Sequence, residues 1–330
     1  MTAGPAKRRT AARDSADRPG GATPAMPSQS PSAQAPWTIG RLLAWTRSHL
    51  ESRAVEDARL AAELLLACAL GCRRIDLYAR FEEAPSEESR AKFREMVAAA
   101  ADHCPIAYIT GRKEFYSLDF VVTPDVLIPR PETELLVERA LAWLAEHPAE
   151  RHDVLDLCTG SGCVAIALCK RNAAIRVVAT DICEKALVVA AENAKRLNVA
   201  DRIGFSSADF LELPPKIVPL GGFDLVTANP PYIGEDQRDT LPENVRRHEP
   251  RGALFAGRDG LDPYRRVARD ILRYLRPTGI LILEIGRGQG AMVREILGAA
   301  GLEWVAGFKD LRGIERALEF RRSPSGLCIE

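Results

Sequence analysis

The chain has 330 residues, which is long enough for two domains of ordinary size. Its hydrophobic content of 46% and charged content of 27% are those of a globular protein, so a sizeable core is expected. Basic and acidic residues each number 45, and the net charge is therefore zero. This balance argues against a protein that mainly grips a nucleic-acid backbone, because that task needs a dominant basic surface, although it leaves room for a local basic groove.

No segment of the sequence is typical of a membrane span or a metal site. The longest apolar run, Leu60 to Cys72, is interrupted by Glu63 and is shorter than the roughly 20 apolar residues that a bilayer requires. The eight cysteines show no Cys-x-x-Cys spacing and the five histidines are scattered, so no metal ligand set is predicted. We expect the cysteines to be small buried hydrophobes in a reducing compartment, and the protein to be cytoplasmic.

Residues 1–36 differ in composition from the rest of the chain. Ala, Pro, Gly, Ser and Thr make up 25 of these 36 residues, and Val, Ile, Leu and aromatic residues do not occur. Such a segment cannot bury enough apolar surface to offset its ordering entropy, so a disordered tail is predicted. Its basic residues leave an organelle transit peptide as the alternative to a plain unstructured extension.

Residues 37–111 show helical periodicity and are interpreted as a small all-helical domain. Thr38 is placed to cap the first helix, and Gly71 to end the second. Helices are expected from about residue 39 and over 57–70, 75–78 and 86–102. The segment has no catalytic constellation of its own, so docking of a partner and a structural lid are both open interpretations.

Residues 112–130 change to the alternating pattern of strands. Apolar residues alternate from Phe115 to Ile128, and Ser117 and Thr123–Asp125 supply turn chemistry. We therefore expect a β-hairpin that links the helical domain to the remainder of the chain.

Residues 131–330 alternate short apolar runs with helical stretches. This order predicts an α/β domain with a mainly parallel, Rossmann-like sheet, whose ligands bind beyond the carboxyl ends of the strands. The predicted strands are Asp153–Leu157, Arg176–Thr180, Ile203–Ser206, Leu225–Ala228, Gly279–Ile285, Leu302–Phe308 and one near Ala317–Phe320.

A glycine-containing turn and two acids predict a nucleoside pocket. The first strand runs into Cys158-Thr159-Gly160-Ser161-Gly162, a tight turn that precedes a helix whose N-terminal amides are free. Asp181 ends the next strand and can accept both ribose hydroxyl protons. Asp209 and Phe210 follow the third strand, where they could meet the edge and the face of a base. An ordinary turn with surface acids is the alternative interpretation.

The position of Asp156 indicates which nucleoside cofactor the pocket would take. The pyrophosphate of a nicotinamide dinucleotide favours a turn without an acid just before it. Asp156 lies two residues before Cys158, and its negative charge suits the sulfonium and amino groups of S-adenosylmethionine. S-adenosylmethionine is therefore the expected cofactor.

The motif Asn229-Pro230-Pro231-Tyr232 follows the fourth predicted strand and is suited to holding a planar NH₂ group. The side-chain oxygen of Asn229 and the backbone carbonyl of Pro230 can each accept one of its protons, and the two prolines keep the segment rigid. Tyr232 offers a ring face to a flat amide or base. The motif predicts methyl transfer to nitrogen by in-line displacement, with Asn229, Pro230 and Tyr232 catalytic and all four residues binding the substrate.

Several further motifs accompany these two. They are Pro105–Gly111, Glu114–Tyr116, Val126–Glu134, Glu249–Pro250, Ala253–Leu254 and Asp259–Leu261. With the turn at 156–162 and the motif at 229–232, they make residues 37–330 resemble the peptide chain release factor glutamine methyltransferases of the HemK/PrmC type.

The resemblance implies a fold and a reaction. The fold would be a helical domain that docks the release factor and a seven-stranded class I methyltransferase domain with an antiparallel last strand. The reaction would be N5-methylation of the glutamine in the Gly-Gly-Gln loop of class 1 release factors. Residues 229–232 would bind that glutamine, and Cys158–Gly162, Asp181, Phe210 and Asn229 would line the cofactor site. Asp209 is added from its position alone.

Two features depart from the family pattern or lack a clear place in it. Cys158 stands where the first glycine of the turn is usual, which predicts an ordinary backbone angle at this position. Arg130, Glu132 and Thr133 are interpreted as lying at the mouth of the active site or as beginning a helix, and both interpretations can hold together.

Other functions remain open from the sequence. A nucleic-acid amino group presents the same pair of donors as a glutamine amide, but neutral charge and the lack of a target-recognition domain count against such a substrate. A ribosomal-protein glutamine is a closer alternative. A non-catalytic cofactor-binding adaptor is a third, without positive support. No membrane partner and no direct nucleic-acid substrate are expected.

Overall fold

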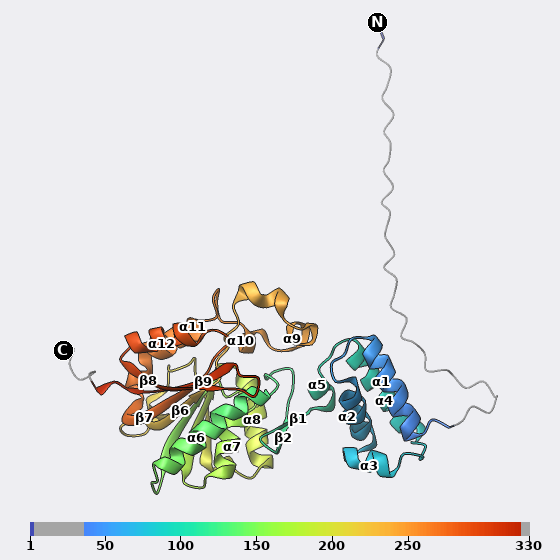
Figure 1. The fold of residues 1–330 in the computed structure, drawn as a ribbon, viewed down its shortest axis with the longest axis horizontal. Coiled ribbons are helices and arrows are strands. Elements are labelled where there is room, and N and C mark those ends of the chain that lie inside the picture. Colours follow the sequence, from blue (N-terminus) through green and yellow to red (C-terminus); the bar gives the residue numbers. More distant parts are fainter. Residues whose placement is uncertain (3–35, 325–330) are drawn as a thin grey trace.

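The computed structural model describes residues 1–2 and 36–324, and the tail predicted over 1–36 lies almost wholly outside them. The described chain begins with a helical body, which Figure 1 shows beside the larger α/β body. Its helices are α1 (Ile39–Ser52), α2 (Ala58–Leu70), α3 (Arg74–Ala79), α4 (Glu87–Ala101) and α5 (Ile106–Thr110).

Local chemistry accounts for the ends of these helices. The Thr38 hydroxyl accepts a hydrogen bond from the amide of Arg41 at 3.3 Å, and Ser86 caps α4 in the same way. Gly71 ends α2 in the left-handed conformation, with φ of 63°. The amphipathic faces then pack into one core that includes Leu42, Leu65 and Phe93.

The acid that interrupts the apolar run of α2 is buried and satisfied. Glu63 accepts hydrogen bonds from Arg59, Arg74 and the Tyr78 hydroxyl. Burial alone would raise the pKa of Glu63, but these donors lower it below its ordinary value. Glu63 therefore ties α3 to α2 rather than marking an exposed helix face.

The predicted hairpin is present but shorter than its sequence pattern. Strands β1 (Arg112–Phe115) and β2 (Leu118–Val121) pair antiparallel around Tyr116 and Ser117, which both have positive φ, as a tight hairpin turn requires. The alternation over 122–130 does not form a strand. Pro124 and Pro129 lack the amide protons that a strand pairing needs, so this stretch crosses as an irregular segment.

The α/β body is built on a seven-stranded sheet in the order β5-β4-β3-β6-β7-β9-β8. Within this sheet β9 runs antiparallel to its two neighbours, and the other recorded pairings are parallel, so the predicted class I methyltransferase arrangement is confirmed. The strands are β3 (His152–Leu157), β4 (Ile175–Asp181), β5 (Ile203–Ser207), β6 (Phe223–Ala228), β7 (Leu275–Glu284), β8 (Leu302–Lys309) and β9 (Glu315–Arg322).

Helices cover both faces of this sheet (Figure 1). Successive residues of β3 alternate between the two cores, with Val154 in one and Leu155 in the other. The first core packs against α6 (Glu134–Glu146), α7 (Cys163–Arg171) and α8 (Glu184–Arg196), and the second against α11 (Asp262–Asp270) and α12 (Gly290–Ala299). The carboxyl ends of the parallel strands remain free for a site.

The segment between β6 and α11 forms short elements that the sequence did not predict. They are the 3-10 helix η4 (Glu235–Thr240) and the short α-helices α9 (Glu243–His248) and α10 (Arg251–Leu254). Three arginines gather here, and each of them has an acidic partner. Arg246 pairs with Asp239, Arg251 with Glu235, and Arg247 with Glu243 and with Asp102 of the helical body.

The cysteines within the described residues are all free thiols. Cys163 and Cys169 are buried in the core, and the other five are half-buried. Within residues 1–2 and 36–324, no group of three or more potential metal ligands lies together. In the same part of the chain, no helix has the length and apolar character needed to cross a membrane.

Candidate active site

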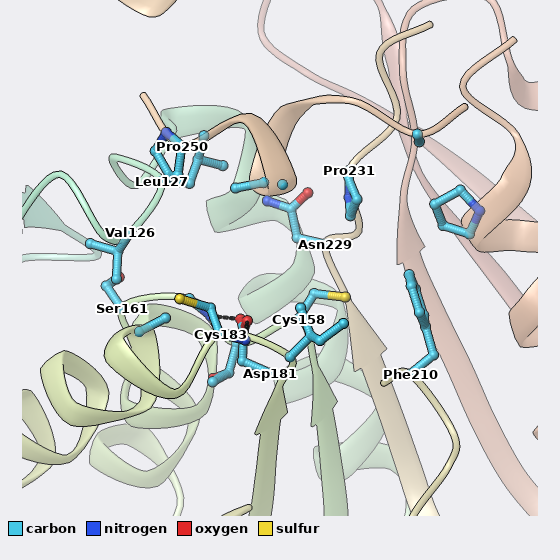
Figure 2. A pocket seen from close by; sticks show the side chains of 18 of the residues that line it. Val126, Leu127, Cys158, Ser161, Asp181, Cys183, Phe210, Asn229, Pro231 and Pro250 are labelled. Carbon is cyan, nitrogen blue, oxygen red and sulfur yellow. Dashed lines mark hydrogen bonds between the residues drawn. The ribbon is translucent and has the colours of Figure 1, made fainter. Parts of the chain in front are cut away.

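A cavity of about 450 Å³ lies at the carboxyl ends of the parallel strands, where ligands of such sheets bind. Figure 2 shows side chains from several strand ends arranged around it, with Asn229 between the turn after β3 and the segment that carries Leu127. The sequence-predicted residues that line this cavity are Cys158, Thr159, Gly160, Ser161, Asp181, Asp209, Phe210, Asn229 and Pro231.

The two glycines of the turn serve different purposes. Gly160 lines the cavity, with φ of 54° and open space where a Cβ would lie. Gly162, with φ of 79°, is absent from the cavity wall; a Cβ there would lie 3.0 Å from Ile166 and 3.1 Å from Ala190. Gly162 therefore permits close packing of α7 against α8, which differs from the direct cofactor contact predicted for it.

The expectation of an ordinary backbone angle at Cys158 is wrong. Its φ is 56°, in the left-handed region that favours glycine. The neighbouring amide of Thr159 donates to the carbonyl of Thr180 at 2.9 Å, which anchors the start of the turn to β4. The turn thus keeps its glycine-like shape, and the Cys158 side chain lines the cavity. Burial, and then the nearby acids, raise the pKa of its thiol, so it stays protonated.

Asp181 at the end of β4 is fixed by backbone amides. Its two oxygens accept from the amides of Gly160 and Cys183, each at 2.9 Å. Burial nevertheless raises the pKa of Asp181 above its ordinary value. The carboxylate is held rigidly in the cavity wall, and its remaining lone pairs are available to hydroxyl donors of a ligand.

Asp156 near the end of β3 is a buried acid of the same cavity. Its oxygens accept from the hydroxyls of Thr159 at 2.6 Å and Thr227 at 2.7 Å. Burial raises the pKa of Asp156 to about 6, despite these two hydrogen bonds. A cation bound in the cavity would stabilise the ionised form, so the site favours a positively charged ligand.

Asp209 and Phe210 share a partner that sequence reasoning missed. Arg266 of α11 pairs with the Asp209 carboxylate at 2.7 Å, and its guanidinium lies 4.6 Å from the centroid of the Phe210 ring. All three residues line the cavity, with Phe210 in a strained positive-φ conformation. The predicted contact of Asp209 with a base thus has a competitor, because this carboxylate already has a cationic partner.

A second cavity, of about 270 Å³, adjoins the first. The two share Leu127, Arg130, Asn229 and Ala253 in their walls. Of the predicted motif, Pro230 and Tyr232 line the smaller cavity and Pro231 the larger one, while Asn229 belongs to both. The motif therefore forms part of the partition between two chambers.

The comparisons with known proteins match both bodies. Residues 41–111 match the family model described as the PrmC N-terminal domain, and residues 154–252 match a methyltransferase domain model. A release factor glutamine methyltransferase from Rhodopirellula baltica is 39% identical over 293 residues, covering 87% of this chain and 97% of that protein. One of the same name from Geobacter sulfurreducens is 41% identical over 284 residues, covering 86% of this chain and 96% of that protein.

The chain belongs to the release factor glutamine methyltransferase family. It therefore belongs to a family of enzymes, and methyltransferases of this fold use S-adenosylmethionine. Among solved structures, the catalytic domain of hMettl16 in complex with a MAT2A 3'UTR hairpin has a TM-score of 0.51 and 19% identity, covering 70% of this chain and 82% of that one. This likeness shows the fold alone.

The observed cavity fits such a cofactor. Asp181 presents a fixed acceptor at the end of β4, and Asp156 presents a buried acid that favours a cation. Gly160 leaves open space in the wall, so backbone can approach a ligand closely. These acidic acceptors thus suit a hydroxyl-bearing, positively charged nucleoside.

Arg130, Glu132 and Thr133, which the sequence left with two interpretations, lie at the partition between the two cavities. Pro131–Thr133 forms a 3-10 turn before α6, so the helix-start interpretation holds for the backbone. Arg130 pairs with Glu249, and Arg130 and Glu132 line the smaller cavity. Thr133 lines the larger cavity and accepts a hydrogen bond from Asn229 Nδ2 at 3.1 Å.

Glu284 is the functional candidate that sequence reasoning missed. It ends β7 with 1% of its surface exposed, and it accepts from the hydroxyls of Thr133 at 2.7 Å and Tyr232 at 3.2 Å. Its signal was available, because it is the one acid inside the apolar run Gly279–Ile285. Burial raises the pKa of Glu284 to about 7, with the two hydroxyls acting in the opposite direction.

Proposed function

We propose that this protein transfers the methyl group of S-adenosylmethionine to the side-chain nitrogen, N5, of the glutamine in the Gly-Gly-Gln motif of class 1 release factors. The observation that carries the proposal is the place of Asn229 in the partition between two adjoining cavities. The larger cavity would hold the cofactor and the smaller one the glutamine side chain. The names of the relatives support the substrate.

The glutamine amide would be held by two oxygens. The Nδ2 of Asn229 donates to Thr133, which leaves Oδ1 as the free acceptor of that side chain. The carbonyl of Pro230 would accept the second amide proton, since proline fixes the backbone there. Both contacts draw electron density onto a nitrogen whose lone pair is otherwise delocalised into its carbonyl.

Positioning and electrostatics then account for the reaction. S-adenosylmethionine, when bound, supplies an electrophilic methyl group on a sulfonium. Asn229 and Pro230 would align the amide nitrogen for in-line displacement, and the ring of Tyr232 would support the flat amide. After transfer, the positively charged product nitrogen loses a proton readily, so no strong base is needed in the wall.

In the larger cavity we assign the cofactor to the predicted residues. The turn from Cys158 to Ser161 would approach the methionine part, and Asp181 the ribose hydroxyls. Phe210 would pack on the base, with Asp209 beside it. We assign Gly162 to this set through the shape of the turn, because its own place is between helices.

The other parts of the chain are assigned by the same proposal. The helical body, residues 37–111, would dock the release factor, and residues 112–130 would link it to the methyltransferase domain at 131–330. The substrate of the reaction belongs to translation termination, so we place the enzyme in the cytoplasm.

The direct test is methylation of purified class 1 release factor with isotopically labelled S-adenosylmethionine, followed by peptide mass spectrometry. We expect one labelled methyl group to replace a hydrogen on the glutamine of the Gly-Gly-Gln motif. In Asn229→Ala, methyl transfer should fall by at least about a hundredfold, in the range seen when one preorganised polar contact is lost. Cofactor affinity should change by less than about threefold. Label on another residue, or wild-type turnover in Asn229→Ala, would reject the proposal.

A further inference from the structure

Four side chains at the partition form one connected hydrogen-bond chain. Asn229 Nδ2 donates to Thr133 Oγ1, and Thr133 Oγ1 donates to Glu284 Oε2. From the other side, the Tyr232 hydroxyl donates to Glu284 Oε1. We propose that Thr133 and Glu284 are positioning residues that hold the Asn229 carboxamide in the one orientation able to accept a substrate amide. The inference rests on the proposed function.

A carboxamide can be placed in two orientations that differ little in shape. The oxygen and the NH₂ group of Asn229 are nearly equal in size, so packing alone does not fix which of them faces the substrate. If Asn229 turned its NH₂ toward the substrate NH₂, two donors would face each other. The site therefore needs a partner that distinguishes the two ends of the Asn229 amide.

Thr133 alone cannot provide this distinction. A threonine hydroxyl has one proton and two lone pairs, so it can donate to an amide oxygen or accept from an amide NH₂. Glu284 removes the choice when it is ionised, above its pKa of about 7, because a carboxylate is then an acceptor only. The Thr133 proton goes to Glu284, its lone pair faces Asn229 Nδ2, and Oδ1 of Asn229 must point away from Thr133.

The surroundings of Glu284 favour a role in positioning over one in stability. A buried carboxylate loses its hydration, and two neutral hydroxyl donors replace only part of it. Arg316 is the nearby cation, but its guanidinium bonds to Asp310 at 3.2 Å, and Glu132 adds a like charge. The β7 backbone at Glu284 pairs with β9, so the carboxylate is rigidly placed.

The test compares Thr133→Val, which keeps the shape but removes the hydroxyl, with Thr133→Ser, which keeps the hydroxyl. On release factor, Thr133→Val should lower kcat by about tenfold to a hundredfold, as expected for loss of a hydrogen bond linked to a charge. KM and cofactor affinity should stay within about threefold, and Thr133→Ser should recover most of the loss. Equal kcat in the two variants would overturn the positioning role of Thr133.

Glu284→Gln tests the far end of the same chain. If both residues act through Asn229, the double variant Thr133→Val with Glu284→Gln should be no slower than the slower single variant. If the fold-losses in kcat of the two single variants multiply in the double variant, the two residues act independently, and the proposed hydrogen-bond chain is rejected. Melting temperatures of all variants separate this outcome from a loss of folded protein.

A measurement without substrate separates this inference from the proposed function. In ¹⁵N-labelled protein, the side-chain NH₂ of Asn229 is assigned by its absence in Asn229→Asp. We expect its protons to exchange slowly with water in wild type and Thr133→Ser, and quickly in Thr133→Val. Equal exchange rates in wild type, Thr133→Ser and Thr133→Val would overturn the positioning role of Thr133. Slow exchange in a wild type that leaves release factor unmethylated would overturn the proposed function instead.

Discussion

At the scale of single residues, two buried acids, Asp156 on β3 and Glu284 on β7, have the same kind of hydrogen-bond partners. Each receives a pair of hydroxyl hydrogen bonds, from Thr159 and Thr227 in the first case and from Thr133 and Tyr232 in the second. Hydroxyls satisfy a carboxylate without neutralising it, so both acids keep pKa values raised by burial. Asp156 is thereby suited to a cationic ligand, and Glu284 to fixing the direction of a hydrogen-bond chain.

Asp156 should make cofactor binding depend on pH. Its pKa of about 6 in the folded protein means that the carboxyl is mostly protonated below this pH and ionised above it. A cationic ligand binds the ionised form better, so affinity for S-adenosylmethionine should rise with pH. The raised pKa of Asp181 acts in the same direction. From the ionised fraction of Asp156, binding at about pH 7.5 should be roughly fourfold tighter than at about pH 5.5.

Calorimetric titration at the two pH values measures this difference. The matched control is Asp156→Asn, which should bind more weakly at the higher pH and show a much smaller change between the two. A wild-type affinity that falls as pH rises would contradict the role given to Asp156.

Sequence reasoning at this scale reaches what is local. The roles proposed for Asn229, Pro230 and Tyr232 were predicted because these residues are adjacent and their chemistry can be read from four residues. The bond between Thr133 and Glu284 joins positions 151 apart, and the bond between Asn229 and Thr133 joins positions 96 apart. Nothing in the neighbourhood of either residue indicates such a partner, so only the fold could bring them together.

At the scale of elements, the two glycines of the turn between β3 and α7 have different surroundings. Gly160 faces the cavity and Gly162 faces the helix pair α7 and α8. Both have positive φ, so alanine at either position carries the cost of a left-handed residue, about 1–2 kcal/mol. At Gly162, the close approach of Ile166 and Ala190 adds overpacking.

Gly162→Ala should therefore affect mainly stability, and Gly160→Ala mainly cofactor binding. Gly162→Ala should lower the free energy of unfolding by about 2–4 kcal/mol, more than Gly160→Ala, because strain and overpacking add. Gly160→Ala should weaken cofactor binding more than Gly162→Ala, since its new methyl group points at the cavity. Urea unfolding and calorimetric titration of the two variants give both comparisons. The reverse ranking in either would contradict the assigned roles.

The regular elements were largely predictable, and the reasons are visible in the pattern. All seven strands of the sheet were predicted as apolar runs, and α1, α2 and α4 were predicted from helical periodicity, with capping residues at Thr38 and Gly71. The elements between β6 and α11 were not foreseen. Helices of four to six residues are too short for a repeating apolar face, and Arg247 of α9 has a partner, Asp102, that lies far away in the sequence.

At the scale of the whole molecule, a helical body stands beside the catalytic body and is joined to it by the hairpin (Figure 1). A second link runs through the exposed ion pair between Asp102 and Arg247 of α9. Within the described residues, the helical body contributes no residue to either cavity. Its surface is therefore free to act on the substrate as a whole rather than on the reacting group.

This arrangement predicts that intact release factor is a far better substrate than free glutamine. Remote contacts on a docked protein supply binding energy that a single amino acid cannot, and that energy orients the amide at Asn229. We expect kcat/KM for free glutamine to be lower by at least about a thousandfold. Competition between labelled substrates in one reaction measures the ratio directly. Equal turnover of the two would show that docking plays no part.

The position of β9 between β7 and β8 has a consequence for the order in which the enzyme is made. Residues from Asp125 onwards line the two cavities, but Arg316 belongs to the wall of the smaller one, and β7, which carries Glu284, gains its neighbour β9 only with residues 315–322. During synthesis, every recognisable motif has therefore left the ribosome before the pocket exists. A nascent chain halted shortly before residue 315 would carry the whole signature of a methyltransferase and lack its finished interior.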